Sequence, residues 1–96
     1  MKILEKTNEY ENWFNDLKDK LVRARIAARI RRLSEGNAGD VEPVGEGVSE
    51  MRMHFGSGWR VYYTERHGTL IILLAGGKKS TQKRDIKLAL ELARNL

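Results

Sequence analysis

One stretch of the chain decides the fold, and it reads Ser49-Glu50-Met51-Arg52-Met53-His54-Phe55, then Gly56-Ser57-Gly58, then Trp59-Arg60-Val61-Tyr62-Tyr63. Apolar and polar residues alternate in both flanking segments, which is typical of a β-strand with one buried face. The glycine-rich triplet between them is typical of a three-residue hairpin turn. The sequence therefore predicts an antiparallel β-hairpin.

This turn also predicts how the two strands pair. If Phe55 lies opposite Trp59, then Met53 faces Val61 on the buried side of the hairpin. A slip by one residue would place methionines against arginines, so the buried side of each strand is strongly specified. The other side of the hairpin is expected to be exposed to solvent, and it carries Arg52, His54, Arg60 and Tyr62.

The remaining sequence surrounds the hairpin with helices and further strands. Asn8 and Glu11 have the form of a capping box at the start of a helix. Along the chain we expect a strand over 2–6, helices over 8–17 and 20–35, a loop over 37–47 with one short edge strand, the hairpin, a central strand over 69–75 and a helix that begins at Ser80 or Thr81. This order predicts an α+β fold, a single domain over 1–96. Its small, mostly antiparallel sheet is expected to pack on one face against two N-terminal helices and a C-terminal helix.

Composition limits the class of protein. The 96 residues suffice for one domain, and 41% apolar with 32% charged residues is the balance of a folded globular chain. Because there is no cysteine, a disulfide framework, a thiolate nucleophile and cysteine-bound zinc are excluded. The longest apolar run, Leu70 to Ala75, is too short to span a bilayer, and the N-terminus lacks a secretory signal. We therefore expect a cytoplasmic protein with no membrane partner.

Charge is segregated along the chain. The net charge of +5 comes from 18 Lys and Arg against 13 Asp and Glu. The helix expected over 20–35 is strongly basic, whereas the segment 35–50 holds acidic residues and no basic one. A basic helix can bind phosphate groups, but a solvated helix face has the same composition. Arg25, Arg29 and Arg32 are our candidates for RNA contacts on this helix.

The polar side of the hairpin carries the groups that RNA cleavage needs. Guanidinium and ammonium groups bind phosphate and stabilise transition-state charge, and a histidine moves protons near neutral pH. A tyrosine can stack on a base, so Tyr62 is a candidate RNA-binding residue. Lys78 and Lys79 follow the central strand. RNA supplies its own nucleophile, the 2′-hydroxyl, so no metal ion or cofactor is expected. A solvated sheet face remains the alternative.

The chain also resembles a known family. The residues that carry the likeness are Gly36–Asp40, Val44–Arg52, Gly58–Tyr63, Leu73–Gln82 and Asp85-Ile86. In this pattern it is similar to the addiction-module killer proteins, HigB-like members of the RelE/ParE toxin superfamily. The resemblance implies a compact α+β toxin of a type II toxin–antitoxin pair. RelE-like members cleave mRNA in the ribosomal A site by 2′-hydroxyl attack on the adjacent phosphate.

The resemblance also implies roles for particular residues. The alternating basic pair of RelE-type toxins matches Arg52 and His54, the arginine after the turn matches Arg60, and the base after the last strand matches Lys79. The tyrosine of the terminal helix has no counterpart here; its position falls near Asp85, with Gln82 close by. On this basis His54 is expected to transfer the proton, Arg60 and Lys79 to stabilise the transition state, and Arg52 to anchor phosphate. Lys78, Gln82 and Asp85 are further candidates for substrate contacts.

Two other functions stay open on the sequence. A ParE-like gyrase inhibitor has the same fold and no active site, and a non-catalytic nucleic-acid-binding module would also use a basic surface. The expected partners of an mRNA-cleaving toxin are the ribosome, mRNA and a cognate antitoxin, which in HigB-like pairs is usually a helix-turn-helix protein. Operator DNA would be bound only through that antitoxin.

Overall fold

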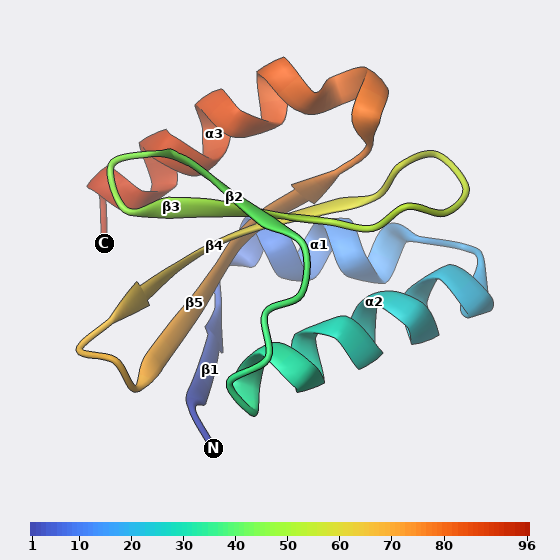
Figure 1. Cartoon of the computed structure of the whole chain (residues 1–96). Helices are drawn as coiled ribbons and strands as arrows, with labels where there is room; N and C mark the ends of the chain where they lie inside the picture. The colour runs from blue at the N-terminus through green and yellow to red at the C-terminus, as the bar shows by residue number, and fades with distance from the viewer.

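The computed structural model describes residues 1–96, and its centre is a five-stranded sheet (Figure 1). The strands lie in the order β1-β5-β4-β3-β2; β1 and β5 are parallel and the other neighbours are antiparallel. The mostly antiparallel sheet of the predicted α+β fold is thus confirmed. The strands are β1 (Ile3–Lys6), β2 (Val41–Gly45), β3 (Val48–Arg52), β4 (Arg60–Arg66) and β5 (Leu70–Gly77), and the helices are α1 (Asn8–Asp16), α2 (Lys20–Ser34) and α3 (Gln82–Arg94), the last preceded by a 3₁₀ turn over Lys79–Thr81.

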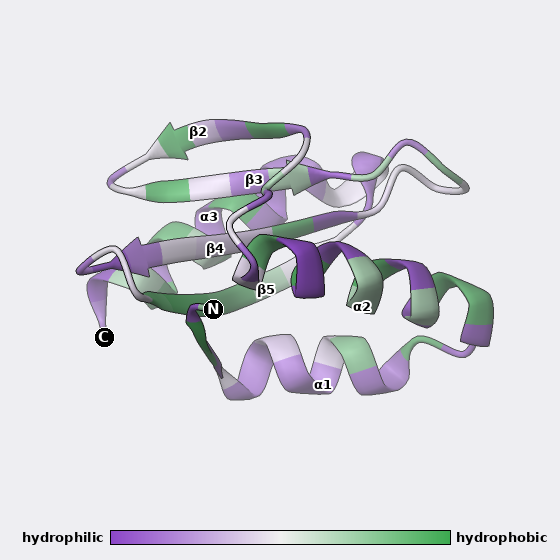
Figure 2. Cartoon of the chain, turned by 60° about the horizontal axis from the view of Figure 1, so that its bottom comes forward, coloured by the Kyte–Doolittle hydropathy of each residue, from purple (hydrophilic) through white to green (hydrophobic).

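Helices cover both faces of the sheet, and the expectation that they share one face is wrong. In Figure 1, α3 lies on one side of the sheet and α1 with α2 on the other. Tyr10 and Ile26 from α1 and α2 belong to one buried cluster, whereas Ala89 from α3 belongs to a second. The cause lies in β5, which is apolar along most of its length (green in Figure 2). Because successive side chains of a strand point to opposite faces, both faces of β5 must be covered.

The hairpin pairs two residues away from the predicted register. Met51 rather than Met53 lies opposite Val61, and Arg52 lies opposite Arg60. The connection between the strands runs from residue 53 to residue 59, longer than the three-residue turn that we expected. Inside it, the amide of Met53 donates to the Trp59 carbonyl oxygen at 2.9 Å. Because the shift is an even number of residues, every side chain keeps its predicted face.

Both N-terminal helices begin at capping side chains. Thr7, one residue before the expected Asn8, caps α1: its hydroxyl oxygen accepts from the amide of Tyr10 at 3.0 Å and donates to the Leu74 carbonyl oxygen at 2.6 Å. The second bond ties the start of α1 to β5, and local sequence could not indicate it. Asp19 caps α2, accepting from the amide of Leu21 at 2.9 Å. No helix in the structure is both long enough and apolar enough to span a membrane.

Candidate active site

The four residues expected to be catalytic line one depression beside the hairpin loop. This hairpin depression has a volume of about 730 Å³, and its lining includes Arg52, His54, Arg60 and Lys79. Gln82, at the start of α3, also lines it. The side chains come from β3, β4, the hairpin loop and the 3₁₀ turn after β5, so only the folded sheet brings residues 52 and 79 together. None of the lining residues is acidic, and the carboxylates that pair with Arg52 and Arg60 lie outside the lining.

Arg60 lies at the base of the hairpin depression, and its side chain is only 10% exposed. Nη1 donates to the carbonyl oxygen of Gly58 at 2.7 Å. Nε lies 3.5 Å from the Oε2 oxygen of Glu50 and has no hydrogen-bond partner. A buried guanidinium needs such a counter-charge, because an unpaired charge in the interior is strongly destabilising. These contacts hold Arg60 in one orientation.

Glu50 is a residue of the candidate site that sequence analysis did not single out. Its side chain is 3% exposed, and its Oε2 accepts from the Tyr62 hydroxyl at 3.0 Å and from Gln82 Nε2 at 2.8 Å. The carboxylate thus joins β3, β4 and α3 beneath the depression. The signal that could have found it was its place on the polar side of the hairpin, two residues before Arg52. Because the alternation predicts that this side faces solvent, a carboxylate there is what an ordinary solvated strand face would carry.

Two of the predicted RNA-binding residues, Tyr62 and Asp85, are buried. Tyr62 is completely buried under α3, so its ring is not available to stack on a base. Burial, followed by the nearby Glu50 carboxylate, raises the pKa of Tyr62 well above its usual range. Asp85 is 4% exposed and accepts from the Thr81 hydroxyl at 2.5 Å. Its carboxylate therefore stabilises the start of α3 and does not reach the depression.

Asp40, an acidic loop residue, contacts Arg52 at the end of β3 and His54 in the hairpin loop. Asp40 bonds to Nε2 of His54 through one oxygen and accepts from Arg52 Nη2 at 3.2 Å through the other. Glu42 accepts from the same Nη2, also at 3.2 Å. The bond from His54 and then that from Arg52 lower the pKa of Asp40, and Asp40 raises the pKa of Arg52. Asp40 was not a sequence-based candidate either, because only the fold brings this loop residue to Arg52 and His54.

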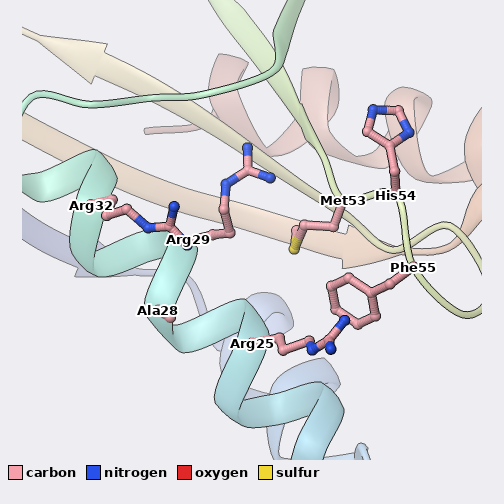
Figure 3. Close-up of a pocket in the computed structure, with 7 residues that line it drawn as sticks. All are labelled: Arg25, Ala28, Arg29, Arg32, Met53, His54 and Phe55. Carbon is pink, nitrogen blue, oxygen red and sulfur yellow. The ribbon is translucent and has the colours of Figure 1, made fainter.

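The candidate arginines of α2 border the same region. Arg25, Arg29 and Arg32 project from the helix and, with His54, line a second cleft of about 320 Å³ (Figure 3). The Arg25 guanidinium stacks over Phe55, 4.8 Å from the ring centre. The Arg29 guanidinium makes hydrogen bonds within the fold: it donates to the carbonyl oxygens of Arg52 at 2.9 Å and Ala38 at 3.2 Å. His54 therefore lines both recesses, the cleft beside α2 and the hairpin depression.

Lys78 is separated from the four residues of the hairpin depression. It is exposed and lines a different hollow, beside Trp13 and Trp59. Each of the two glycines before Lys78 lets a side chain pack directly against its backbone. A Cβ on Gly76 would lie 2.2 Å from the Trp13 ring, and one on Gly77 would lie 1.8 Å from the Asp85 carboxylate. Because these two positions have no side chain, α1 and α3 can both pack closely against the end of β5.

The chemistry available in the hairpin depression is that of cations and one imidazole. No group of three or more His, Asp or Glu side chains that could hold a metal ion is present in the structure. Arg52, Arg60 and Lys79 can bind an anion and stabilise added negative charge, and His54 can exchange a proton.

A family comparison matches most of the chain. Residues 12–95 match the profile of the family described as phage-derived protein Gp49-like (DUF891). The chain belongs to the Gp49-like family. This Gp49-like protein is also 47% identical over 90 residues to an uncharacterised protein of Haemophilus influenzae, with 94% of this chain and 91% of that protein covered.

Solved structures similar to this Gp49-like protein are RelE toxins. A double-arginine mutant of Escherichia coli RelE in the free state has a TM-score of 0.71 at 14% identity, with 94% and 95% of the two chains covered. RelE in the intact E. coli RelBE toxin–antitoxin complex has a TM-score of 0.68 at 15% identity, with 81% and 96% covered. The Gp49-like protein therefore has the RelE fold, as the resemblance implied.

Proposed function

We propose that this protein is the toxin of a type II toxin–antitoxin pair and cleaves mRNA on the ribosome. The observation that carries the proposal is the hairpin depression, in which three cationic side chains and a histidine converge without a carboxylate among the lining residues. The RelE fold adds support, since it is the fold of a toxin that is solved in complex with its antitoxin.

In the proposed reaction the 2′-oxygen of one nucleotide attacks the adjacent phosphorus. The bond to the 5′-oxygen of the next nucleotide breaks, leaving a 2′,3′-cyclic phosphate and a 5′-hydroxyl. Arg60, held at the base of the depression, and Lys79, exposed at its edge, stabilise the negative charge that develops on the phosphoryl oxygens. Arg52 binds the phosphate, although Asp40 and Glu42 share its guanidinium.

His54 takes the proton from the 2′-hydroxyl, and a proton from solvent converts the departing 5′-oxygen into the 5′-hydroxyl. The contact between its Nε2 and the Asp40 carboxylate favours the tautomer with hydrogen on Nε2, because a carboxylate only accepts. Nδ1 then has a free lone pair for the substrate. The ring is exposed, as its side chain is 74% accessible, so RNA can reach it. Asp40 acts as a positioning residue for this histidine.

The basic face of α2 docks the protein on structured RNA. Arg25 and Arg32 are exposed, and Arg32 makes no ion pair in the structure. Since both line the cleft that His54 also lines, RNA bound along α2 can continue toward His54 (Figure 3). Phosphate contacts of this kind weaken steeply with salt.

The partner that inhibits this activity is an antitoxin. An acidic segment of that protein would pair with Lys79, which forms no ion pair in the structure, and would block access of RNA to the depression. We further place the protein with HigB-like toxins, whose antitoxins are usually helix-turn-helix proteins that bind operator DNA. Its place of action, with ribosomes and mRNA, is the cytoplasm.

The test is induction of the wild-type chain and single-residue variants in a bacterial host, with growth and mRNA 5′-ends mapped together. Wild type should arrest growth and create new 5′-hydroxyl ends in translated frames. His54→Ala should lower cleavage by about 10²-fold or more, the lower range for general acid–base catalysis, and Lys79→Ala by a similar amount. Lys83→Ala is the matched control, because Lys83 is an exposed lysine of α3 outside the depression.

Growth arrest without mRNA cleavage, accompanied by a change in plasmid supercoiling, would favour a gyrase inhibitor. Cleavage that survives at the wild-type rate in both His54→Ala and Lys79→Ala would remove the assignment of the active site. A protein that binds RNA but neither arrests growth nor cleaves would be a non-catalytic binding module.

A further inference from the structure

We propose that a second recess, the tryptophan hollow, binds one nucleobase of the RNA whose backbone lies in the hairpin depression. It has a volume of about 270 Å³, and its lining includes Trp13, Trp59, Gly76, Lys78 and Arg84. Small-molecule sites usually span about 300–1,000 Å³, so this one suits a single ring system. The inference rests on the proposed function and adds a subsite to it.

The hollow has a rigid aromatic surface. The rings of Trp13 and Trp59 lie 6.4 Å apart between centroids, at an angle of 58°, and both are partly exposed. Trp13 packs directly on the backbone of Gly76, where no Cβ would fit. An indole fixed in this way loses little entropy when a base stacks on it, and stacking tolerates any base.

Two cations border the aromatic surface. Lys78 is exposed and forms no ion pair in the structure. The Arg84 side chain is 78% exposed and lies 3.5 Å from the Asp85 carboxylate through Nε, which leaves its terminal nitrogens free of ion pairs. No lining residue is acidic. The combination of stacking surface and free cations is that of single-stranded nucleic-acid sites.

The tryptophan hollow and the hairpin depression meet at one peptide. Lys78 lines the first and Lys79 lines the second, and Lys78 has an extended backbone with φ −136° and ψ 171°. Neighbouring residues of an extended chain project to opposite sides. The amide of Lys79 also donates to the Ser57 carbonyl oxygen at 3.2 Å, which fixes this peptide against the hairpin loop. RNA crossing it can place a phosphate beside Lys79 and the adjacent base against the tryptophans.

The arrangement in space supports this path. The C-terminal end of α1, the hairpin loop and the start of α3 all lie at the same end of the molecule (Figure 1). Trp13 comes from α1, Trp59 from the hairpin and Arg84 from α3. An acidic protein segment could also contact the cations, but it would not need a bare indole surface between them. We therefore favour RNA over protein as the occupant.

The experiment uses intrinsic fluorescence, because both tryptophans of the chain line the hollow. Free protein carrying His54→Ala is titrated with a short 2′-O-methyl RNA, which has no nucleophile and is not cleaved. The RNA should quench the fluorescence, and an abasic oligomer of equal length should bind at least about fivefold more weakly, which is the lower limit for stacking of one base. Lys78→Ala and Arg84→Ala should each weaken binding and reduce its salt dependence, whereas Lys83→Ala should not.

Three results would overturn the inference: no quenching by the RNA, equal affinity for the abasic oligomer, or affinities of Lys78→Ala and Arg84→Ala equal to that of Lys83→Ala. Quenching by an acidic, tryptophan-free peptide in place of the RNA would assign the hollow to a protein partner. The outcome is separate from that of the proposed function. If quenching occurs but the wild type cleaves no mRNA in cells, the subsite stands without the reaction; if mRNA is cleaved without quenching, only the subsite is lost.

Discussion

Glu50 is the residue on which the arrangement of the candidate active site depends most. Its buried carboxylate faces Arg60 and accepts hydrogen bonds from Tyr62 and Gln82. Glu50→Ala leaves the Arg60 guanidinium buried without a counter-charge. We expect this change to lower the free energy of unfolding by about 3–5 kcal/mol, measured by urea denaturation.

Glu50→Gln is the informative comparison for that prediction. Glutamine keeps the size of the side chain and an accepting oxygen, so it should cost less than alanine. Glu42→Ala is the matched control, since Glu42 is an exposed carboxylate that also faces an arginine, Arg52. Exposed pairs contribute about 0–1 kcal/mol. An equal loss of stability in Glu42→Ala and Glu50→Ala would contradict the role given to burial.

At the scale of elements, the end of β5 is where the two helical layers meet the sheet. Gly76 has no positive backbone angle, so an added methyl group would act only through its contact with the Trp13 ring. Gly76→Ala should lower the free energy of unfolding by about 1–3 kcal/mol through overpacking and should shift the tryptophan fluorescence. Ser80→Ala, at an exposed position nearby, should stay within about 0.5 kcal/mol of the wild type. Unchanged stability in Gly76→Ala would mean that α1 moves freely over β5.

At the scale of the whole molecule, the three tyrosines make stability depend on alkaline pH. Tyr10, Tyr62 and Tyr63 are all buried, and burial raises the pKa of each above its usual value of about 10. The contribution of the three tyrosines to the free energy of unfolding is fully present below pH about 10. It is lost as pH rises, because the unfolded state releases the phenolic protons at lower pH than the folded state does. The free energy of unfolding should therefore fall steadily above pH about 10.

Urea unfolding between pH 8 and 11 checks this, with phenolate absorbance followed in parallel. The phenolate signal should appear together with unfolding. Tyr62→Phe should reduce the pH slope, while costing about 0.5–1.5 kcal/mol at pH 8 through the lost bond to Glu50. Titration of all three tyrosines in a folded protein would show that their rings are accessible to solvent.

The sequence by itself determined the elements and the sides of the hairpin. Alternation in residues 49–63 predicted that Met51 and Val61 lie in the core. This prediction holds although the predicted register was wrong by two residues, because side chains of a strand return to the same face every second residue. The helical stripe of α2 and the edge strand β2 were likewise predictable, since they depend on local spacing. The basic residues of the hairpin and of the segment after β5 were visible in the sequence, and the family resemblance selected Arg52, His54, Arg60 and Lys79 among them.

Tertiary structure alone decided what each polar side chain can do. The same face of the hairpin holds an exposed His54 and a buried Tyr62, because α3 covers one part of that face and not the other. Glu50 and Asp40 acquire their roles from Arg60 and His54, partners that other elements bring to them. Periodicity reports which side of a strand a residue occupies, but burial and charge pairing depend on residues that are distant in sequence.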